Sequence, residues 1–209
     1  MSLAEDFLLL ALREEDGKPL IGNLQLECGL AGAVLVELAA ARRIDVDGEQ
    51  IVVRDPAPLG TPEEDATLAR ISEEEPHDLQ WWIRSLRSGL YERTLARLIA
   101  RGVVDEQRRR PLGILPSTRH LTIDPAPARE LRRRLSAIFD DAPADPGTVA
   151  LLAIVKAGTL DRVILPEIDP DTVERRIREL SEGEQVAEAV AKVIKYIQVA
   201  LVIVVSAAV

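Results

Sequence analysis

The sequence RRRPLGILP, residues 108–116, joins three consecutive arginines to a short apolar stretch between two prolines. Guanidinium groups suit phosphate because each one donates two parallel hydrogen bonds. Exposed aliphatic residues at the same place are typical of a surface that contacts a membrane or another subunit. We therefore predict a binding segment formed by Arg108, Arg109, Arg110, Leu112, Ile114 and Leu115.

A row of arginines precedes this segment. Arg93, Arg97 and Arg101 are four residues apart, so they line one side of a helix whose other side carries Leu95 and Leu98. Such a row is either a solvated helix surface or the beginning of a basic surface that continues into the three consecutive arginines. The spacing alone leaves both interpretations open.

The basic residues are concentrated in one part of an acidic chain. Residues 84–134 contain 13 arginines and five acidic residues, a surplus of eight positive charges, although the 209-residue chain has a formal net charge of −9. The remainder therefore carries −17. This asymmetry predicts one basic face, whereas the overall negative charge disfavours indiscriminate binding to nucleic acid or anionic lipid.

The residue patterns of common catalytic and metal sites are missing from the sequence. His77, His120 and the single cysteine, Cys28, match no usual zinc pattern, and no nucleotide-binding or serine-hydrolase motif occurs. We therefore predict a protein that is not an enzyme and that has no metal or cofactor. The lone cysteine favours a cytoplasmic protein, and the excess of arginine over lysine, 22 to 4, indicates a bacterial genome.

Hydrophobic periodicity predicts a mostly α-helical single domain over residues 1–209, with two β-hairpins. Ser2 and Glu5 have the spacing of a capping box. Asp47-Gly48 between alternating apolar residues indicates a hairpin at 44–55, and a second hairpin at 102–124 carries the basic and apolar tip. The uncharged residues 196–209 fall short of the roughly 20 apolar residues of a membrane span, so we expect a buried helix there. Helices are predicted at 2–13, 24–43, 63–74, 78–87, 90–101, 128–140, 146–157, 171–181 and 184–205.

Several segments, in this order, resemble the Golgi phosphoprotein 3 family. SLAEDFLLLALREEDG is similar to the start of that family, and CGLAGAVLVELAAARRI is similar to its glycine-spaced second helix. WWIRSL, LARLIARGVV, DPGTVALLAIVKAG and RRIREL then follow in the order of the family. The resemblance therefore spans nearly the whole chain.

The resemblance implies a peripheral membrane protein that binds phosphatidylinositol 4-phosphate in a basic pocket and associates reversibly with the inner face of a membrane. It also implies that the hairpin, here residues 103–121, contacts the membrane or another subunit. The pocket of the family uses a tryptophan and three arginines, two of them three residues apart. The corresponding residues here do not match, although a shift of the alignment brings Arg87 or Arg93 into the pocket. The unmatched positions are Gly22, Ala31, Ser88 and Tyr91.

Two alternative functions use the same hairpin. In one, residues 108–116 form the interface of a homo-oligomeric scaffold. In the other, residues 95–124 form a winged helix, whose basic wing contacts DNA phosphates. No helix with polar base-reading residues precedes this wing, and the net negative charge of the chain opposes binding to a duplex, so nucleic acid is the less favoured partner.

Overall fold

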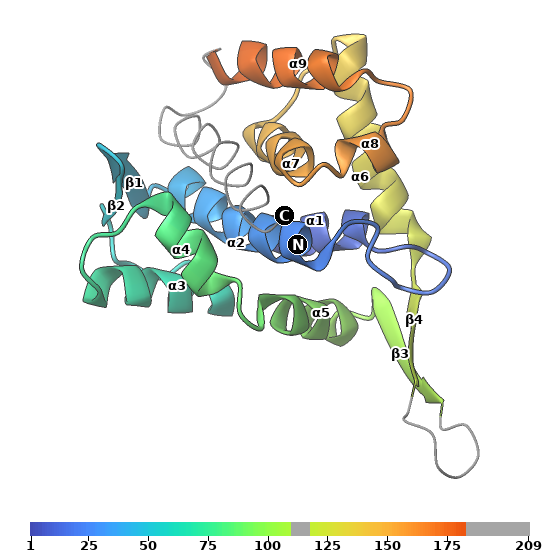
Figure 1. Ribbon diagram of the computed structural model, residues 1–209, viewed down its shortest axis with the longest axis horizontal. Coiled ribbons are helices and arrows are strands. Elements are labelled where there is room, and N and C mark those ends of the chain that lie inside the picture. The colour runs from blue at the N-terminus through green and yellow to red at the C-terminus, as the bar shows by residue number, and fades with distance from the viewer. Residues whose placement is uncertain (110–117, 183–209) are drawn as a thin grey trace.

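Two apolar helices, α1 (Leu3–Ala11) and α2 (Asn23–Ala40), lie against each other at the centre of the protein (Figure 1). The structure is a computed structural model that describes residues 1–109 and 118–182. Most residues of both helices are buried, as expected of helices that are apolar on every side. The predicted mostly α-helical fold is therefore confirmed.

The other helices cover this central pair on two sides (Figure 1). On one side lie α3 (Pro62–Glu73), α4 (Leu79–Leu86) and α5 (Leu90–Ala100). On the other side α6 and α7 contact α1, and α9 packs on α7. The bounds of this second group are α6 (Pro125–Ala137), a 3-10 turn (Ile138–Asp140), α7 (Pro146–Ala157), α8 (Asp161–Ile164) and α9 (Pro170–Glu182).

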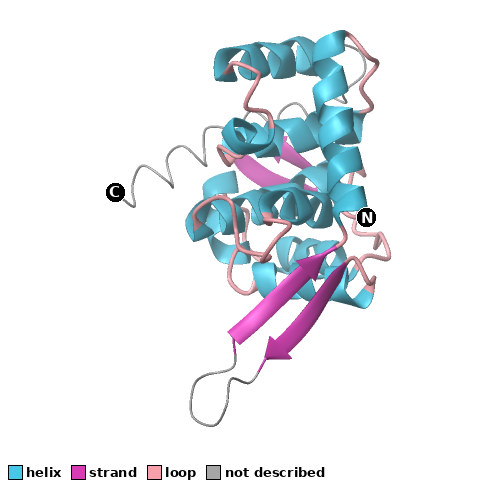
Figure 2. Ribbon diagram, turned by 90° about the vertical axis from the view of Figure 1, so that its right-hand side faces the viewer, coloured by secondary structure: helices cyan, strands magenta, loops and turns pink. Residues whose placement is uncertain are grey.

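Two antiparallel hairpins extend from the helices, as the sequence predicts. The first pairs β1 (Ile44–Asp47) with β2 (Gln50–Val53), and the second pairs β3 (Val104–Arg109) with β4 (Thr118–Ile123). The second hairpin projects away from the helices like an arm (Figures 1 and 2). Val104 and Ile123 are partners at its base and both are buried, so the helical core holds this end of the arm.

Local capping explains where several elements begin. The predicted capping box is confirmed, because Ser2 Oγ accepts a hydrogen bond from Glu5 N–H and a Glu5 carboxylate oxygen accepts one from Ser2 N–H. Helix α6 begins three residues earlier than predicted, since Asp124 accepts a hydrogen bond from Ala126 N–H and Pro125 takes the first turn of the helix.

Two further differences from the sequence prediction concern short elements. In the first hairpin Asp47 pairs with Gln50, so the two-residue turn is Gly48 and Glu49 rather than Asp47-Gly48. Gly48 has φ +62° there, a conformation that glycine adopts without steric cost. The short helix α8 was not predicted, because four residues carry too little periodicity. The predicted helix at 184–205 and most of the predicted tip lie outside the described residues.

The described core is one continuous hydrophobic cluster that runs from Ala4 in α1 to Ile177 in α9. Phe7 is fully buried at its centre, where its ring lies against Gly29 of α2 and near Gly158 at the end of α7. A Cβ atom at position 29 would be 2.4 Å from Phe7 Cζ. Gly29 therefore permits the close approach of α1 and α2, on which the other helices are placed.

Candidate functional site

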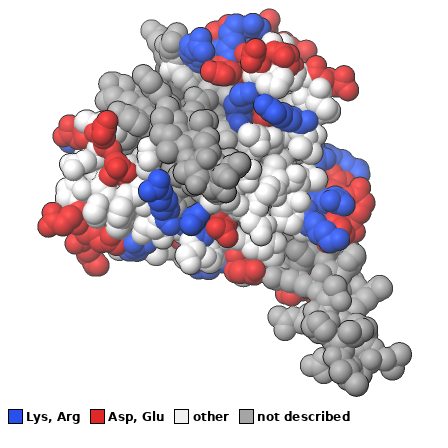
Figure 3. Space-filling model, viewed as in Figure 1, with Lys and Arg blue, Asp and Glu red and all other residues white. Residues whose placement is uncertain are grey.

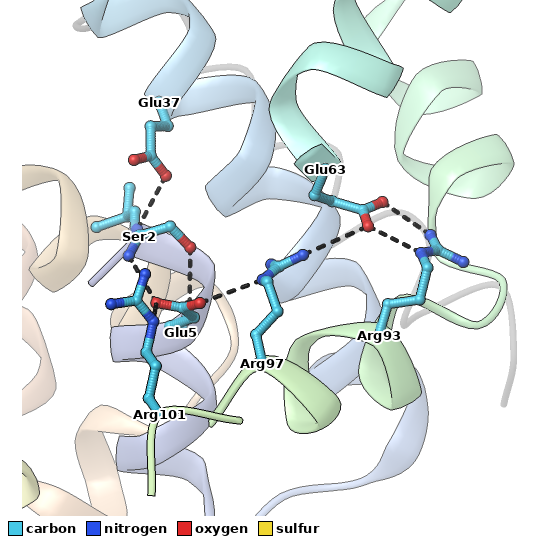
Figure 4. Close-up of polar contacts among 8 residues, drawn as sticks. Ser2, Glu5, Glu37, Glu63, Arg93, Arg97 and Arg101 are labelled. Carbon is cyan, nitrogen blue, oxygen red and sulfur yellow. Dashed lines mark hydrogen bonds and ion pairs between the residues drawn. The ribbon is translucent and has the colours of Figure 1, made fainter. Parts of the chain in front are cut away.

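The candidate site begins on α5, which carries the row of arginines along one side. Leu95 and Leu98 are fully buried on the opposite side, so the helix presents Arg93, Arg97 and Arg101 toward the edge of the core. Figure 4 shows that these arginines point to two glutamates on other helices. The sequence identified the row but not its partners.

Arg93 forms a bidentate ion pair with Glu63 in the first turn of α3. Its Nε and Nη2 groups donate to the two carboxylate oxygens of Glu63, each at 2.8 Å. These hydrogen bonds raise the pKa of Arg93 above its ordinary value. Arg93 Nη1 also donates to the backbone oxygen of Ser88 at 3.1 Å, so this side chain ties α5 both to α3 and to its own preceding turn.

Arg97 and Arg101 meet Glu5 of α1. Arg97 Nε lies 3.2 Å from Glu5 Oε1, and Arg101 Nε lies 3.3 Å from Glu5 Oε2. Arg97 Nη1 lies 3.6 Å from Glu63, so Arg97 bridges both carboxylates. The Glu5 side chain is 1% exposed. The three guanidinium groups are thus largely compensated by two carboxylates, which reduces what they offer to an external anion.

Arg84 and Arg87 lie at the end of α4, three residues apart, and form a different arginine pair. No carboxylate of the described chain lies within ion-pair distance of either one. Arg87 lies near the Cys28 thiol. Burial raises the pKa of Cys28, and the charges of Arg87 and Arg84 oppose that rise. Both arginines therefore sit beside α2, and Arg84 is exposed.

Arg87 is among the site residues predicted from the sequence, whereas Arg84 is not. The spacing of three residues was the available signal, because positions i and i+3 lie on the same side of a helix. The structure adds that their side of α4 faces α2, through the proximity of both to Cys28.

A surface hollow of about 370 Å³ separates the first turn of α2 from the first turn of α5. One of the four family pocket positions, Tyr91, lines it. Gly22 is the N-cap of α2, and Ser88 lies in the connection between α4 and α5. Ala31 is fully buried and contributes no polar group. The lining residues, two of them acidic, are Pro19, Asn23, Leu26, Glu27, Tyr91 and Glu92.

The projecting hairpin carries the remaining candidates. Its register places Arg108 directly opposite Arg119, and Arg109 opposite Thr118. Arg110, Leu112, Ile114 and Leu115 lie outside the described residues, so their contribution to the site stays a prediction.

Elsewhere on the surface the basic residues alternate with acidic ones. Figure 3 shows both signs side by side over α9 and α6. Arg133 pairs with Glu130, and Arg178 pairs with Glu174. Arginines on these helices therefore form ordinary mixed surfaces rather than a second basic face.

The described residues give no sign of a metal site or of an exposed membrane-spanning helix. No group of three or more His, Cys, Asp or Glu side chains among them is arranged to hold a metal ion. One described helix, α2, is long and apolar enough to cross a membrane by length and composition, but 67% of that stretch is buried inside the protein. Its apolar character is accounted for by its place in the core.

Comparison with protein families gives one match that covers most of the chain. The family model described as Golgi phosphoprotein 3 (GPP34) matches residues 3–197. This range includes every described helix and strand.

Proposed function

Because the chain belongs to the Golgi phosphoprotein 3 family, we propose that it is a non-enzymatic peripheral membrane protein that binds anionic phospholipid. The binding surface consists of Arg84 and Arg87 together with the arginines of the projecting hairpin. Leu112, Ile114 and Leu115 at the tip contact the acyl chains. The protein associates reversibly with the inner face of a membrane.

The observation that carries this proposal is the projecting arm with opposed arginines. Arg108 and Arg119 occupy the same level of a two-stranded hairpin that extends away from the helices. A hairpin of two strands is marginally stable by itself, so contact with another surface would stabilise it. The strands of this arm carry Arg108, Arg109 and Arg119, and a concentration of positive charge on a projecting element attracts an anionic surface.

The expected strength is that of reversible recruitment. Each basic residue near an anionic leaflet contributes about 1 kcal/mol. Four such arginines and a partly inserted aliphatic tip therefore reach several kcal/mol, similar to the weak anchoring given by about one acyl chain. The interaction should weaken in high salt because exposed charges are screened.

Phosphatidylinositol 4-phosphate is the headgroup that the family resemblance implies. Among the described residues, the hollow beside Tyr91 is lined by the acidic Glu27 and Glu92 and by no basic side chain, which does not favour a multiply charged phosphate in that hollow. We therefore propose anionic phospholipid as the ligand class and leave the choice of headgroup to a direct comparison.

Vesicle flotation tests this proposal. Vesicles of phosphatidylcholine alone, with phosphatidylglycerol, and with phosphatidylinositol 4-phosphate are mixed with the full chain at low and high salt. We expect binding to one or both anionic compositions and loss of that binding in high salt. A wild-type protein that stays unbound on all of them contradicts the proposal.

Matched variants test whether Arg84 and Arg87 contribute to the binding. Arg84→Gln combined with Arg87→Gln removes two charges that have no carboxylate partner in the described part of the chain, and it should reduce binding by roughly tenfold or more. Arg129→Gln combined with Arg133→Gln removes the same charge from α6, where the arginines pair with Glu14 and Glu130. This control should bind nearly as the wild type does.

The alternatives predict different outcomes for the hairpin tip. Replacing Leu112, Ile114 and Leu115 together by Ser should reduce flotation. If flotation persists and an oligomer dissociates in size-exclusion chromatography with light scattering, the tip is a subunit interface. A salt-sensitive mobility shift with random duplex DNA would instead support the winged-helix alternative. The helix before the wing is α5, whose arginines pair with Glu5 and Glu63, which disfavours base reading by that helix.

A further inference from the structure

Two carboxyl groups face each other where α1, α2 and α3 meet. Glu37 of α2 accepts a hydrogen bond from Leu3 N–H at the start of α1, at 2.9 Å (Figure 4). On the side of α3, the Glu64 carboxyl group lies within hydrogen-bond reach of the Glu37 carboxyl group. A cavity of about 260 Å³ adjoins Glu37 and is also lined by Asp6.

No described cation balances this pair. Glu64 is 1% exposed, and its Oε1 atom has no hydrogen-bond partner in the described chain. Neither Glu37 nor Glu64 takes part in an ion pair between described residues, whereas the adjacent Glu63 pairs with Arg93. An unpaired buried charge is costly, so ionising both neighbouring carboxyl groups carries a large free-energy penalty.

The other charged groups around α2 are committed elsewhere or add negative charge. From α1, Asp6 faces Glu37 and is itself acted on by the N-terminal amine, and from the cavity wall Arg134 pairs with Asp145 at 2.9 Å. The charged groups of the remaining neighbouring elements are paired or lie beside another turn of α2. Asp45 of β1 pairs with Arg54, and Glu63 pairs with Arg93 and Arg97 of α5. At the end of α4, Arg84 and Arg87 lie beside Cys28.

We propose that Glu37 and Glu64 share one proton in the folded protein, and that this proton latches α3 onto α2. The shared proton gives Glu64 a hydrogen-bond partner and removes one of two buried negative charges. This inference does not depend on lipid binding.

The electrostatics of the site support a proton held near neutral pH. Burial raises the pKa of Glu37 from 4.5 to about 7, the Leu3 N–H opposes the rise, and Glu64 adds to it. Burial also raises the pKa of Asp6 from 3.8 to about 6, against the opposing charges of the N-terminal amine and Arg134. Because the folded-state pKa lies above the unfolded value, the stabilisation is full below the unfolded pKa and is lost as the pH rises through about 7.

The latch has a consequence for α5. Glu5 of α1 and Glu63 of α3 are the carboxylates that hold the arginines of α5. Loss of the proton therefore loosens α3, one of the two helices that position α5, whose Glu63 holds Arg93 and Arg97. Above neutral pH we expect weaker anchoring of α5.

Urea unfolding, followed by circular dichroism at pH 5.5 and pH 8.5, tests the latch. In the wild type the Glu37 group should lower the folding equilibrium constant by roughly 30-fold between these pH values. Glu37→Gln and Glu64→Gln should flatten this dependence and should be more stable than the wild type at pH 8.5. Glu73→Gln removes an exposed carboxylate from the same α3 and should keep the wild-type dependence.

Two results would overturn the latch. One is a Glu37→Gln variant that keeps the full wild-type pH dependence, or that is destabilised equally at both pH values. The other comes from the wild type alone, so it holds even if the variants fold poorly. In carboxyl carbon NMR titrations we expect a glutamate resonance with a midpoint near pH 7, and a protein whose glutamates all titrate below pH 6 contradicts the proposal.

Discussion

Glu5 shows how one side chain can serve local and long-range structure together. It closes the capping box at the start of α1, and it also accepts contacts from Arg97 and Arg101 of α5. Its capping partner, Ser2, is three residues away in the chain, whereas Arg97 is 92 residues away. The first helix and the helix before the projecting hairpin are therefore held by the same carboxylate.

Replacing this carboxylate should destabilise the protein clearly. Glu5→Gln leaves Arg97 and Arg101 without their shared counter-charge, and we expect a loss of about 2–4 kcal/mol in the free energy of unfolding. Urea unfolding at neutral pH measures this loss. Glu15→Gln, at an exposed position just after α1, should change the free energy by less than about 0.5 kcal/mol. A Glu5→Gln variant as stable as this control would show that the ion pairs contribute little.

At the scale of elements, the contact between α1 and α2 depends on a close approach at one residue. Phe7 of α1 is fully buried, and its ring occupies the space where a side chain at position 29 would lie. Alanine is a better helix former than glycine by about 1 kcal/mol. The presence of glycine in the middle of α2 is therefore explained by packing and not by helix propensity.

The variant Gly29→Ala tests this packing. Its Cβ atom would lie 2.4 Å from Phe7 Cζ and 2.5 Å from Phe7 Cε1, so we expect a net loss of about 2–3 kcal/mol in the free energy of unfolding. The loss should be smaller when Gly29→Ala is introduced into a Phe7→Leu background, because the shorter side chain leaves room. Thermal and urea unfolding of the four proteins of this cycle measure the coupling. An additive cycle would contradict the proposed contact.

At the scale of the whole molecule, the arm formed by β3 and β4 is separable from the helices. Its base is held by Val104 and Ile123, while the rest projects away from the core (Figure 2). An element that projects from the core contributes little to global stability. The same projection makes the arm suited to reach a membrane or a partner.

Shortening the arm tests this separation. Replacing residues 108–119 by Asn-Gly joins Gln107 to His120, which already face each other across the two strands, through a favoured hairpin turn. We expect a thermal midpoint within about 2 °C of the wild type, because a change of 1 kcal/mol moves it by about 2–4 °C in a protein of this size, together with loss of vesicle flotation. A midpoint lowered by more than about 5 °C would show that the arm stabilises the helical core.

The sequence by itself determined the features whose signals lie within about ten residues. Apolar periodicity predicted the helices of the described chain, apart from short α8, and the Ser2–Glu5 spacing predicted the capping box. Alternation around Asp47-Gly48 predicted the first hairpin, and two strand-like runs joined by a longer tip predicted the second. The arginine surplus in residues 84–134 and the order of the family segments were also readable, because composition and order require no coordinates. These inferences were confirmed for the fold and for the family.

Only the tertiary structure decided how the charged residues are used. Arg93 and Glu63 are 30 residues apart and Arg97 and Glu5 are 92 apart, so no local pattern showed that the α5 row is paired while Arg84 and Arg87 have no described carboxylate partner. Glu37 and Glu64 likewise come together only because α2 packs against α3. Charge and proton affinity depend on neighbours in space and on burial, and folding alone brings those neighbours together.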